Sequence, residues 1–110
     1  MANTFKNSIT GSIGTSNTIA YQVPAATTTT IIGVSVANVV SQNISVSVTV
    51  RDDSANKTVY LVKDAIITSG GTAVLVGGEQ KIVLEALDSI SVVSSAATSA
   101  DVIVSALELT

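Results

Sequence analysis

Apolar residues recur at every second position over several stretches of this chain. The clearest stretch is Ile44–Arg51, I-S-V-S-V-T-V-R, in which apolar residues at even positions share one face and small hydroxyl residues share the other. Ile90–Val92 and Val102–Val104 repeat the pattern in the C-terminal third. A period of two is typical of a strand with one buried face. Such a sheet needs a second sheet to cover it, so the pattern predicts a two-layered β protein.

The composition supports strands over helices. Val, Ile and Thr make up 42 of the 110 residues, and side chains branched at Cβ favour pleated strands. We predict a single all-β domain over residues 17–110, an antiparallel β-sandwich or jelly-roll-like fold of about eight strands, from turn signals spaced roughly 8–12 residues apart. The predicted strands are Thr18–Val23, Thr27–Val40, Ile44–Arg51, Thr58–Lys63, Thr72–Val76, Gln80–Leu87, Ser89–Ser94 and Asp101–Leu109. Within Thr27–Val40, alternation places Ile32, Val34 and Val36 on the core face.

Residues 1–16 precede the first predicted strand and carry three spaced apolar side chains, Phe5, Ile9 and Ile13, among small polar residues. We interpret them as an N-terminal arm outside the sandwich. Such an arm is often loose in a monomer and ordered against a neighbouring molecule. A frayed terminus is the alternative interpretation.

Residues 7–50 contain no Asp, Glu, Lys or Arg, although the chain has five basic and eight acidic residues. Because interface cores are depleted in charge, we interpret this segment as a surface that another protein covers. The alternative is a hydroxyl-coated sheet face in contact with water. The candidate assembly residues are Phe5, Ile9, Ile13, Thr28, Thr30, Ser35, Ser45, Ser47 and Thr49.

The composition also argues against several kinds of partner. The net charge is −3, the basic residues form no patch, and aromatic residues are 3% of the chain, so we expect no nucleic-acid partner. No apolar run approaches the ~18 residues that cross a bilayer, so we expect no membrane partner. The first residues, M-A-N-T-F-K, lack the apolar core of a signal peptide, and we expect no Sec-type export.

Catalytic and metal-binding residues are scarce. Histidine and cysteine are absent, which excludes a Ser-His-Asp triad and sites built on imidazole or thiolate. A pair of carboxylates could act on sugars, but such clefts usually carry aromatic platforms, and the chain has no Trp, one Phe and two Tyr. We therefore expect no enzyme activity, no cofactor and no metal site.

The segment Asp52–Lys57 imitates the start of a calcium loop. Asp52, Ser54 and Asn56 occupy ligand positions, but Lys57 stands where the glycine belongs and Lys63 where the bidentate Glu belongs. We interpret the segment as a solvated hairpin tip. It is also the one place that would suit a small carbohydrate-binding sandwich module. Asp88, between two predicted strands, is expected to cap a turn.

The run from Val76 to Leu109, V-G-G-E-Q-K-I-V-L-E-A-L-D-S-I-S-V-V-S-S-A-A-T-S-A-D-V-I-V-S-A-L-E-L, resembles small virion structural proteins of marine tailed phages, including those of cyanobacteria. The start M-A-N-T-F and the middle T-V-Y-L-V-K-D-A share the resemblance. That family usually has Gly-Asp-Ser-Ile at a turn where this chain has Leu87 before Asp88. A leucine disfavours the left-handed backbone that glycine permits.

The resemblance implies a non-enzymatic component of a phage particle. The expected function is a capsid decoration or cement protein that binds the head surface as a homo-oligomer, with a trimer as one option. Its expected partners are further copies of itself and the major capsid protein or other virion proteins, and its expected location is the virion, assembled in the host cytoplasm. A neck or tail component, including a tail-tip or fibre-associated one, is the first alternative. The small carbohydrate-binding module is the second.

Overall fold

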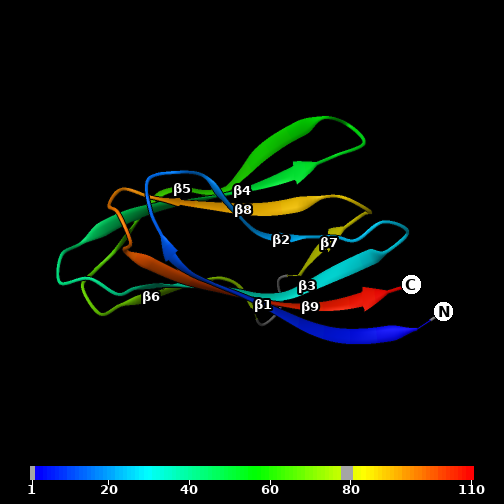
Figure 1. The fold of residues 1–110 in the computed structure, drawn as a ribbon, viewed down its shortest axis with the longest axis horizontal. Coiled ribbons are helices and arrows are strands. Elements are labelled where there is room, and N and C mark those ends of the chain that lie inside the picture. The colour runs from blue at the N-terminus through cyan, green and yellow to red at the C-terminus, as the bar shows by residue number, and fades with distance from the viewer. Residues whose placement is uncertain (1, 78–80) are drawn as a thin grey trace.

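The computed structural model describes residues 2–77 and 81–110, and Figure 1 shows that these residues form strands joined by turns. None of the described residues belongs to a helix long and apolar enough to span a membrane. The strands are β1 (Asn3–Ile13), β2 (Thr18–Gln22), β3 (Thr28–Asn38), β4 (Ile44–Asp52), β5 (Lys57–Ile67), β6 (Thr72–Val76), β7 (Ile82–Leu84), β8 (Ser89–Ser94) and β9 (Ala100–Leu109).

The strands form two antiparallel sheets that lie as two layers (Figure 1). Sheet A has the order β1-β9-β3-β6, with β7 also paired to β3, and sheet B has the order β2-β8-β4-β5. The pairs are nested: β1 with β9, β2 with β8, β3 with β6 and β7, and β4 with β5. This nested pairing across two sheets is the connectivity of a jelly roll. The predicted all-β sandwich or jelly-roll-like domain is therefore confirmed.

The core lies between the sheets and consists mainly of side chains branched at Cβ. In β9 the alternation is regular, with Val102, Val104 and Ala106 buried and Ile103 about half exposed. The other strands of both sheets contribute inward residues in the same way, and these include Val34, Val36, Val46, Val48, Ile90 and Val92. Burial of one such side chain contributes about 1.5–3 kcal/mol, so the core is the main source of stability.

The bulge in β3 overturns one predicted core position. The sequence placed Ile32 on the core face, but the register with β9 shifts between Ile31 and Gly33. A bulge adds one residue to one strand and so changes which side chains point inward. Ile31 is fully buried as a result, and Ile32 is partly exposed.

Residues 1–16 were predicted to form an arm outside the sandwich, but most of them belong to one of its sheets. Asn3–Ile13 form β1, which pairs with β9 along the edge of sheet A. The apolar spacing in this segment gave no sign of a strand, because most β1 side chains stay exposed. Pairing with a strand at the far end of the chain is a tertiary interaction that local pattern does not reveal.

Each of the eight predicted strands has a counterpart among β2 to β9. The predicted strand Gln80–Leu87 corresponds to the shorter β7, and its first residue, Gln80, lies outside the described residues. Thr58–Lys63 corresponds to β5, which continues to Ile67 through a residue with positive φ, Asp64 (φ 52°).

A buried polar network joins the two sheets near the chain termini. The Tyr21 hydroxyl, from β2, donates to Glu108 Oε2 of β9 at 2.6 Å and lies 2.9 Å from Thr29 Oγ1 of β3. Lys6 Nζ lies 3.9 Å from Glu108 Oε1 and gives this buried carboxylate a charged partner. Burial and the hydrogen bond to Glu108 raise the pKa of Tyr21 to about 12.

Replacing Tyr21 by Phe should change how stability depends on alkaline pH. Because the folded-state pKa lies above the unfolded value near 10, Tyr21 stabilises the fold below pH 10 and loses this contribution as pH rises toward 12. We expect Tyr21→Phe to lower the free energy of unfolding by about 2 kcal/mol at pH 7 and the deficit to shrink above pH 10. Urea unfolding at several pH values measures this, with the exposed Tyr60→Phe as control. A deficit that stays constant with pH would contradict the prediction.

The turn between β7 and β8 places a leucine in a left-handed conformation. The Asp88 amide donates to the Glu85 carbonyl oxygen at 3.1 Å, and Leu87, the third residue of that turn, has a φ of 69°. A positive φ at this position alone is the type II geometry, which favours glycine. Leu87 therefore adopts the conformation that its side chain disfavours.

Replacing Leu87 by Gly should stabilise the protein. The left-handed conformation costs a non-glycine residue about 1–2 kcal/mol, and the greater freedom of glycine in the unfolded chain offsets part of the gain. We expect an increase of about 0.5–1 kcal/mol in the free energy of unfolding, measured by urea denaturation. Val83→Gly, in an exposed strand position, should decrease it by about 1 kcal/mol. A decrease in both variants would show that Leu87 is not strained.

Candidate assembly interface

The outer face of sheet A carries two rows of side chains that cross four strands. Directly paired residues share a face in an antiparallel sheet, so the register defines each row. One row consists of Ile9 (β1), Ile103 (β9), Ser35 (β3) and Val74 (β6). The second row consists of Phe5 (β1), Leu107 (β9), Thr30 (β3) and Val83 (β7).

Apolar side chains on this face are well exposed. Phe5 is 77% exposed, Ile9 69% and Val74 68%. An open depression of about 300 Å³ lies beside Phe5 and is lined by Phe5, Lys6, Asn7, Ile32, Ser105 and Ala106. Exposed apolar residues that lie together on one face are typical of a surface that another molecule covers.

Charge is sparse on the same face. Among the outward-pointing strand residues of sheet A that the structure describes, Asp101 is the charged one. It lies at the end of β9 opposite Ala37, and its carboxylate accepts a hydrogen bond from the Ser12 amide at 3.1 Å. Lys6 and Glu108 point to the inner side, where they pair. We call the two rows, with their flanking residues Thr28 and Leu109, the sheet A face.

Five of the nine predicted assembly residues lie together on the sheet A face. They come from β1 and β3, which are separated in the sheet by β9. These residues are Phe5, Ile9, Thr28, Thr30 and Ser35. The structure therefore brings together predicted residues from two segments that are distant in the sequence.

Three predicted residues, Ser45, Ser47 and Thr49, lie on the opposite side of the molecule. They belong to β4, in sheet B, because the chain passes from one sheet to the other between β3 and β4. Ser47 is 8% exposed, and its hydroxyl accepts a hydrogen bond from the Asp64 amide at 2.9 Å. The position predicted for Ser47 at an assembly surface is therefore wrong, because its side chain is buried and bonds to Asp64, where the register of β4 with β5 shifts.

Ile13 is also wrongly predicted, because it lies in the core at 1% exposure. Strict alternation from Ile9 would point Ile13 outward. The register of β1 with β9 shifts between Thr10 and Ile13, and Ser12 has a φ of 56°. This bulge turns Ile13 inward between the sheets.

Sequence reasoning missed the apolar residues that complete the face. Ile103, Leu107, Val74 and Val83 lie outward beside the predicted residues. The sequence of β9 contained a signal for this surface, because apolar residues occupy both even and odd positions of V-I-V-S-A-L-E-L. A strand that is apolar on both faces indicates burial on both faces or an exposed apolar surface.

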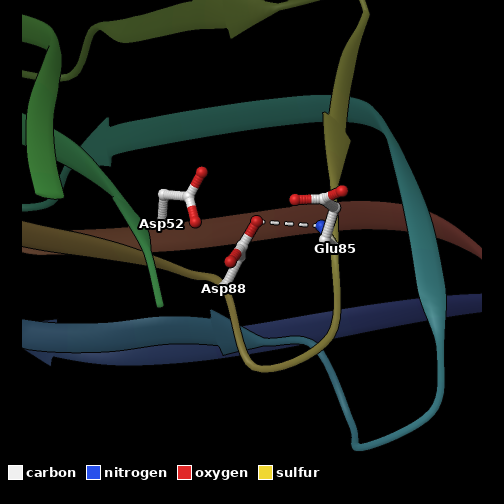
Figure 2. Close-up of side chains that lie close together, drawn as sticks. All are labelled: Asp52, Glu85 and Asp88. Atoms are coloured by element: carbon white, nitrogen blue, oxygen red, sulfur yellow. Dashed lines mark hydrogen bonds between the residues drawn. The ribbon is translucent and has the colours of Figure 1, made fainter. Parts of the chain in front are cut away.

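Three carboxylates lie close together at one end of the sandwich, as Figure 2 shows. Within the described residues, Asp52, Glu85 and Asp88 form the group of acidic side chains near enough to hold a metal ion, with oxygens within 4.8 Å of one another. Asp88 is 4% exposed, and its two oxygens accept hydrogen bonds from the Asp53 and Glu85 amides, both at 2.9 Å. Asp88 therefore ties the β4–β5 hairpin to the β7–β8 turn, as expected of a turn cap.

Asp52 is likewise engaged with its own loop. Its Oδ1 accepts hydrogen bonds from the Ala55 amide at 3.2 Å and from the Ser54 hydroxyl at 2.9 Å. These bonds, that of Ala55 first, lower the pKa of Asp52. At the same tip, Arg51 donates to Asn56 Oδ1 at 2.8 Å. The polar side chains considered for a calcium-like or sugar-binding loop are thus hydrogen-bonded to one another and to the backbone, and these bonds stabilise the hairpin tip.

A depression of about 330 Å³ adjoins this end of the sandwich. Its walls come from the β4–β5 hairpin and from β7, and its lining residues are Val50, Asp52, Ala55, Lys57, Val59, Ile82, Val83, Leu84 and Asp88. None of these residues is an aromatic one on which a sugar ring could stack.

Replacing Asp88 by Ala should destabilise the fold far more than replacing its neighbour Glu85. The change leaves two backbone amides without acceptors, and each such loss costs about 1–3 kcal/mol. We expect Asp88→Ala to lower the free energy of unfolding by about 3 kcal/mol and Glu85→Ala, at an exposed residue, by less than about 0.5 kcal/mol. Urea denaturation of both variants measures this. Equal effects would show that Asp88 does not hold the turn.

The chain matches no protein-family model and no curated protein. Solved structures share its fold. A chain of Bacillus endospore appendages, described as a novel family of disulfide-linked pili, aligns over 98% of this chain and 88% of that chain, with a TM-score of 0.55 and 10% identity. A chain of the T13 IBDV viral particle aligns over 96% of this chain, with a TM-score of 0.58 and 10% identity.

These likenesses show the fold alone, because both identities are 10%. This chain corresponds to 30% of the IBDV chain, so it matches one part of a larger protein. The disulfides of the Bacillus pili have no counterpart here, since this chain contains no cysteine.

Proposed function

We propose that this protein is a non-enzymatic structural component of a virus particle, specifically a capsid decoration or cement protein of a tailed bacteriophage. In this proposal it binds the outside of the head as a homo-oligomer, with the major capsid protein as its partner. It joins the particle during assembly in the host cytoplasm. The fold that it shares with a chain of the IBDV particle supports a role in a virion, as does the resemblance of residues 76–109 to phage virion proteins.

The observation that carries the proposal is the sheet A face. Phe5, Ile9, Ile103, Val74 and Val83 are each between 49% and 77% exposed. Covering each 100 Å² of such apolar surface gains about 2.5 kcal/mol before the cost of ordering. Many copies on a symmetric lattice can compensate for modest affinity at each contact.

A neck or tail component is the alternative within the same class. The apolar face serves either location, so the number of copies per particle distinguishes them. Quantitative mass spectrometry of purified particles, with the major capsid protein as standard, provides this number. Hundreds of copies support the head lattice or a long tail, six or twelve support the neck or baseplate, and absence from particles rejects a virion role.

Charging the sheet A face should abolish binding to the particle. Ile103 is 49% exposed at the centre of one row, so Ile103→Lys leaves the core intact and buries an unpaired charge in the complex. We expect more than about a 100-fold loss of affinity for capsids lacking the protein, measured by co-sedimentation. Tyr60→Lys, at an exposed residue of β5 in sheet B, is the matched control and should bind normally. Normal binding by Ile103→Lys would show that this face is not the interface.

A further inference from the structure

The four edges of the two sheets differ in how well they are protected from pairing with another chain. An unprotected edge presents unpaired N–H and C=O groups to any approaching strand, and proteins block such edges with short strands, prolines, bulges or charges. β2 has five residues and is followed by Pro24, and the edge opposite β1 is divided between the short strands β6 and β7. β5 is long but carries Lys57, Lys63 and Asp64, and its pairing with β4 contains two register shifts.

β1 is the exception among these edges. It has 11 residues, contains no proline, and pairs with β9 in unbroken register from Asn3 to Thr10. Lys6 is its one charged residue, and its side chain forms an ion pair with Glu108 on the inner side of the sheet. Figure 1 shows β1 along the margin of the molecule, with its N-terminal half beside the C-terminal half of β9.

The phase of the β1–β9 ladder identifies which backbone groups are free. Ala2 and Thr110 exchange both of their backbone hydrogen bonds, at 3.1 and 3.0 Å. Antiparallel ladders alternate between hydrogen-bonded and non-hydrogen-bonded pairs, so even-numbered residues from Thr4 to Thr10 bond to β9. The N–H and C=O groups of Asn3, Phe5, Asn7 and Ile9 therefore point to the open edge.

We propose that β1 pairs antiparallel with β1 of a second copy of this chain, about a two-fold axis at Asn7. In this register Asn7 lies opposite Asn7 of the second copy, and Phe5 lies opposite Ile9. Residues 5, 7 and 9 are those whose backbone groups are free, so each opposed pair can exchange two hydrogen bonds. The interface is isologous, the usual form for a dimer.

The side chains favour this register over its neighbours. Phe5 and Ile9, both exposed, lie two residues on either side of Asn7 and so form two aromatic–aliphatic cross-strand pairs on the outer face. Lys6 lies opposite Ser8 of the second copy. A shift that centres the axis on Lys6 would place two lysines directly opposite each other, which is unfavourable.

The pairing joins the two copies of sheet A into one continuous sheet. The apolar rows then run from Val74 and Val83 of one copy through both β1 strands to those of the other. The inference deepens the homo-oligomer part of the proposed function by naming the edge and the symmetry. Its test uses purified protein without particles, so its failure is distinguishable from a failure to bind capsids.

Single cysteines in this cysteine-free chain test the register. Asn7→Cys places two thiols across the axis, at the separation of about 5.5 Å between Cα atoms that a disulfide accepts. Lys6→Cys and Ser8→Cys place them on diagonal positions about 7–8 Å apart, beyond that reach. Under mild oxidation we expect a disulfide-linked dimer for Asn7→Cys and at least a ten-fold lower yield for the other two. Equal yields, or none for Asn7→Cys, would overturn the register.

Proline substitution tests the edge itself. Asn7→Pro removes an N–H that points to the open edge and leaves the bonds to β9, so it should keep the circular dichroism of the native protein. Light scattering should then show a mass of 11.1 kDa in place of twice that value for the native protein. Ser8→Pro removes a bond to β9 and should lower the melting temperature as well. A native protein that is monomeric at all concentrations, or an Asn7→Pro variant that remains a dimer, would overturn the proposal.

Discussion

Burial of valine and isoleucine between two sheets is the interaction on which the rest of this structure depends. Among the residues that the structure describes, the core contains one aromatic side chain, Tyr21, and otherwise consists of small and branched aliphatic residues. Such side chains suit the spacing of about 10 Å between packed sheets. Because each strand buries only one face, a second sheet is needed to cover the first, and in this chain the strands pass between the two sheets repeatedly. The first strand pairs with the last, and each inner pair is nested within it, so both sheets contain strands from the two halves of the chain.

Polar side chains hold the ends of the sandwich, where the aliphatic core stops. Tyr21 and Glu108 join the sheets at one place, and Asn38 joins them at another by donating to the Ile67 carbonyl oxygen at 3.0 Å. Asp88 binds two turns at once. Each of these groups is buried and bonded, as buried polar groups generally are. Through these bonds, the carboxylates of Asp88 and Glu108 order loops and strand ends.

The same aliphatic composition leaves apolar side chains on the outside of sheet A. Sheet B also exposes apolar side chains on its outer face, namely Ile19, Tyr60 and Ile66. Sheet B differs in charge, because that face also carries Arg51, Lys63 and Asp64. The two outer faces are therefore alike in exposing apolar side chains and unlike in how much charge they carry. This asymmetry supports a role in an assembly, and the open edge of β1 lies on the margin of the apolar side.

Alternation and β-branched composition determined the fold class, the eight strands from β2 to β9 and the turn-capping role of Asp88, because these depend on local spacing and on turn chemistry. The sequence did not determine which faces those strands present. Bulges turned Ile13 inward and put Ile31, instead of Ile32, in the core. The crossing from β3 to β4 put Ser35 and Ser47 on opposite sides of the molecule. Only the tertiary structure decided that residues 3–13 form a strand and that Phe5 lies beside Leu107. Pairing between the two ends of the chain depends on a sheet edge that exists only after the strands between them have packed.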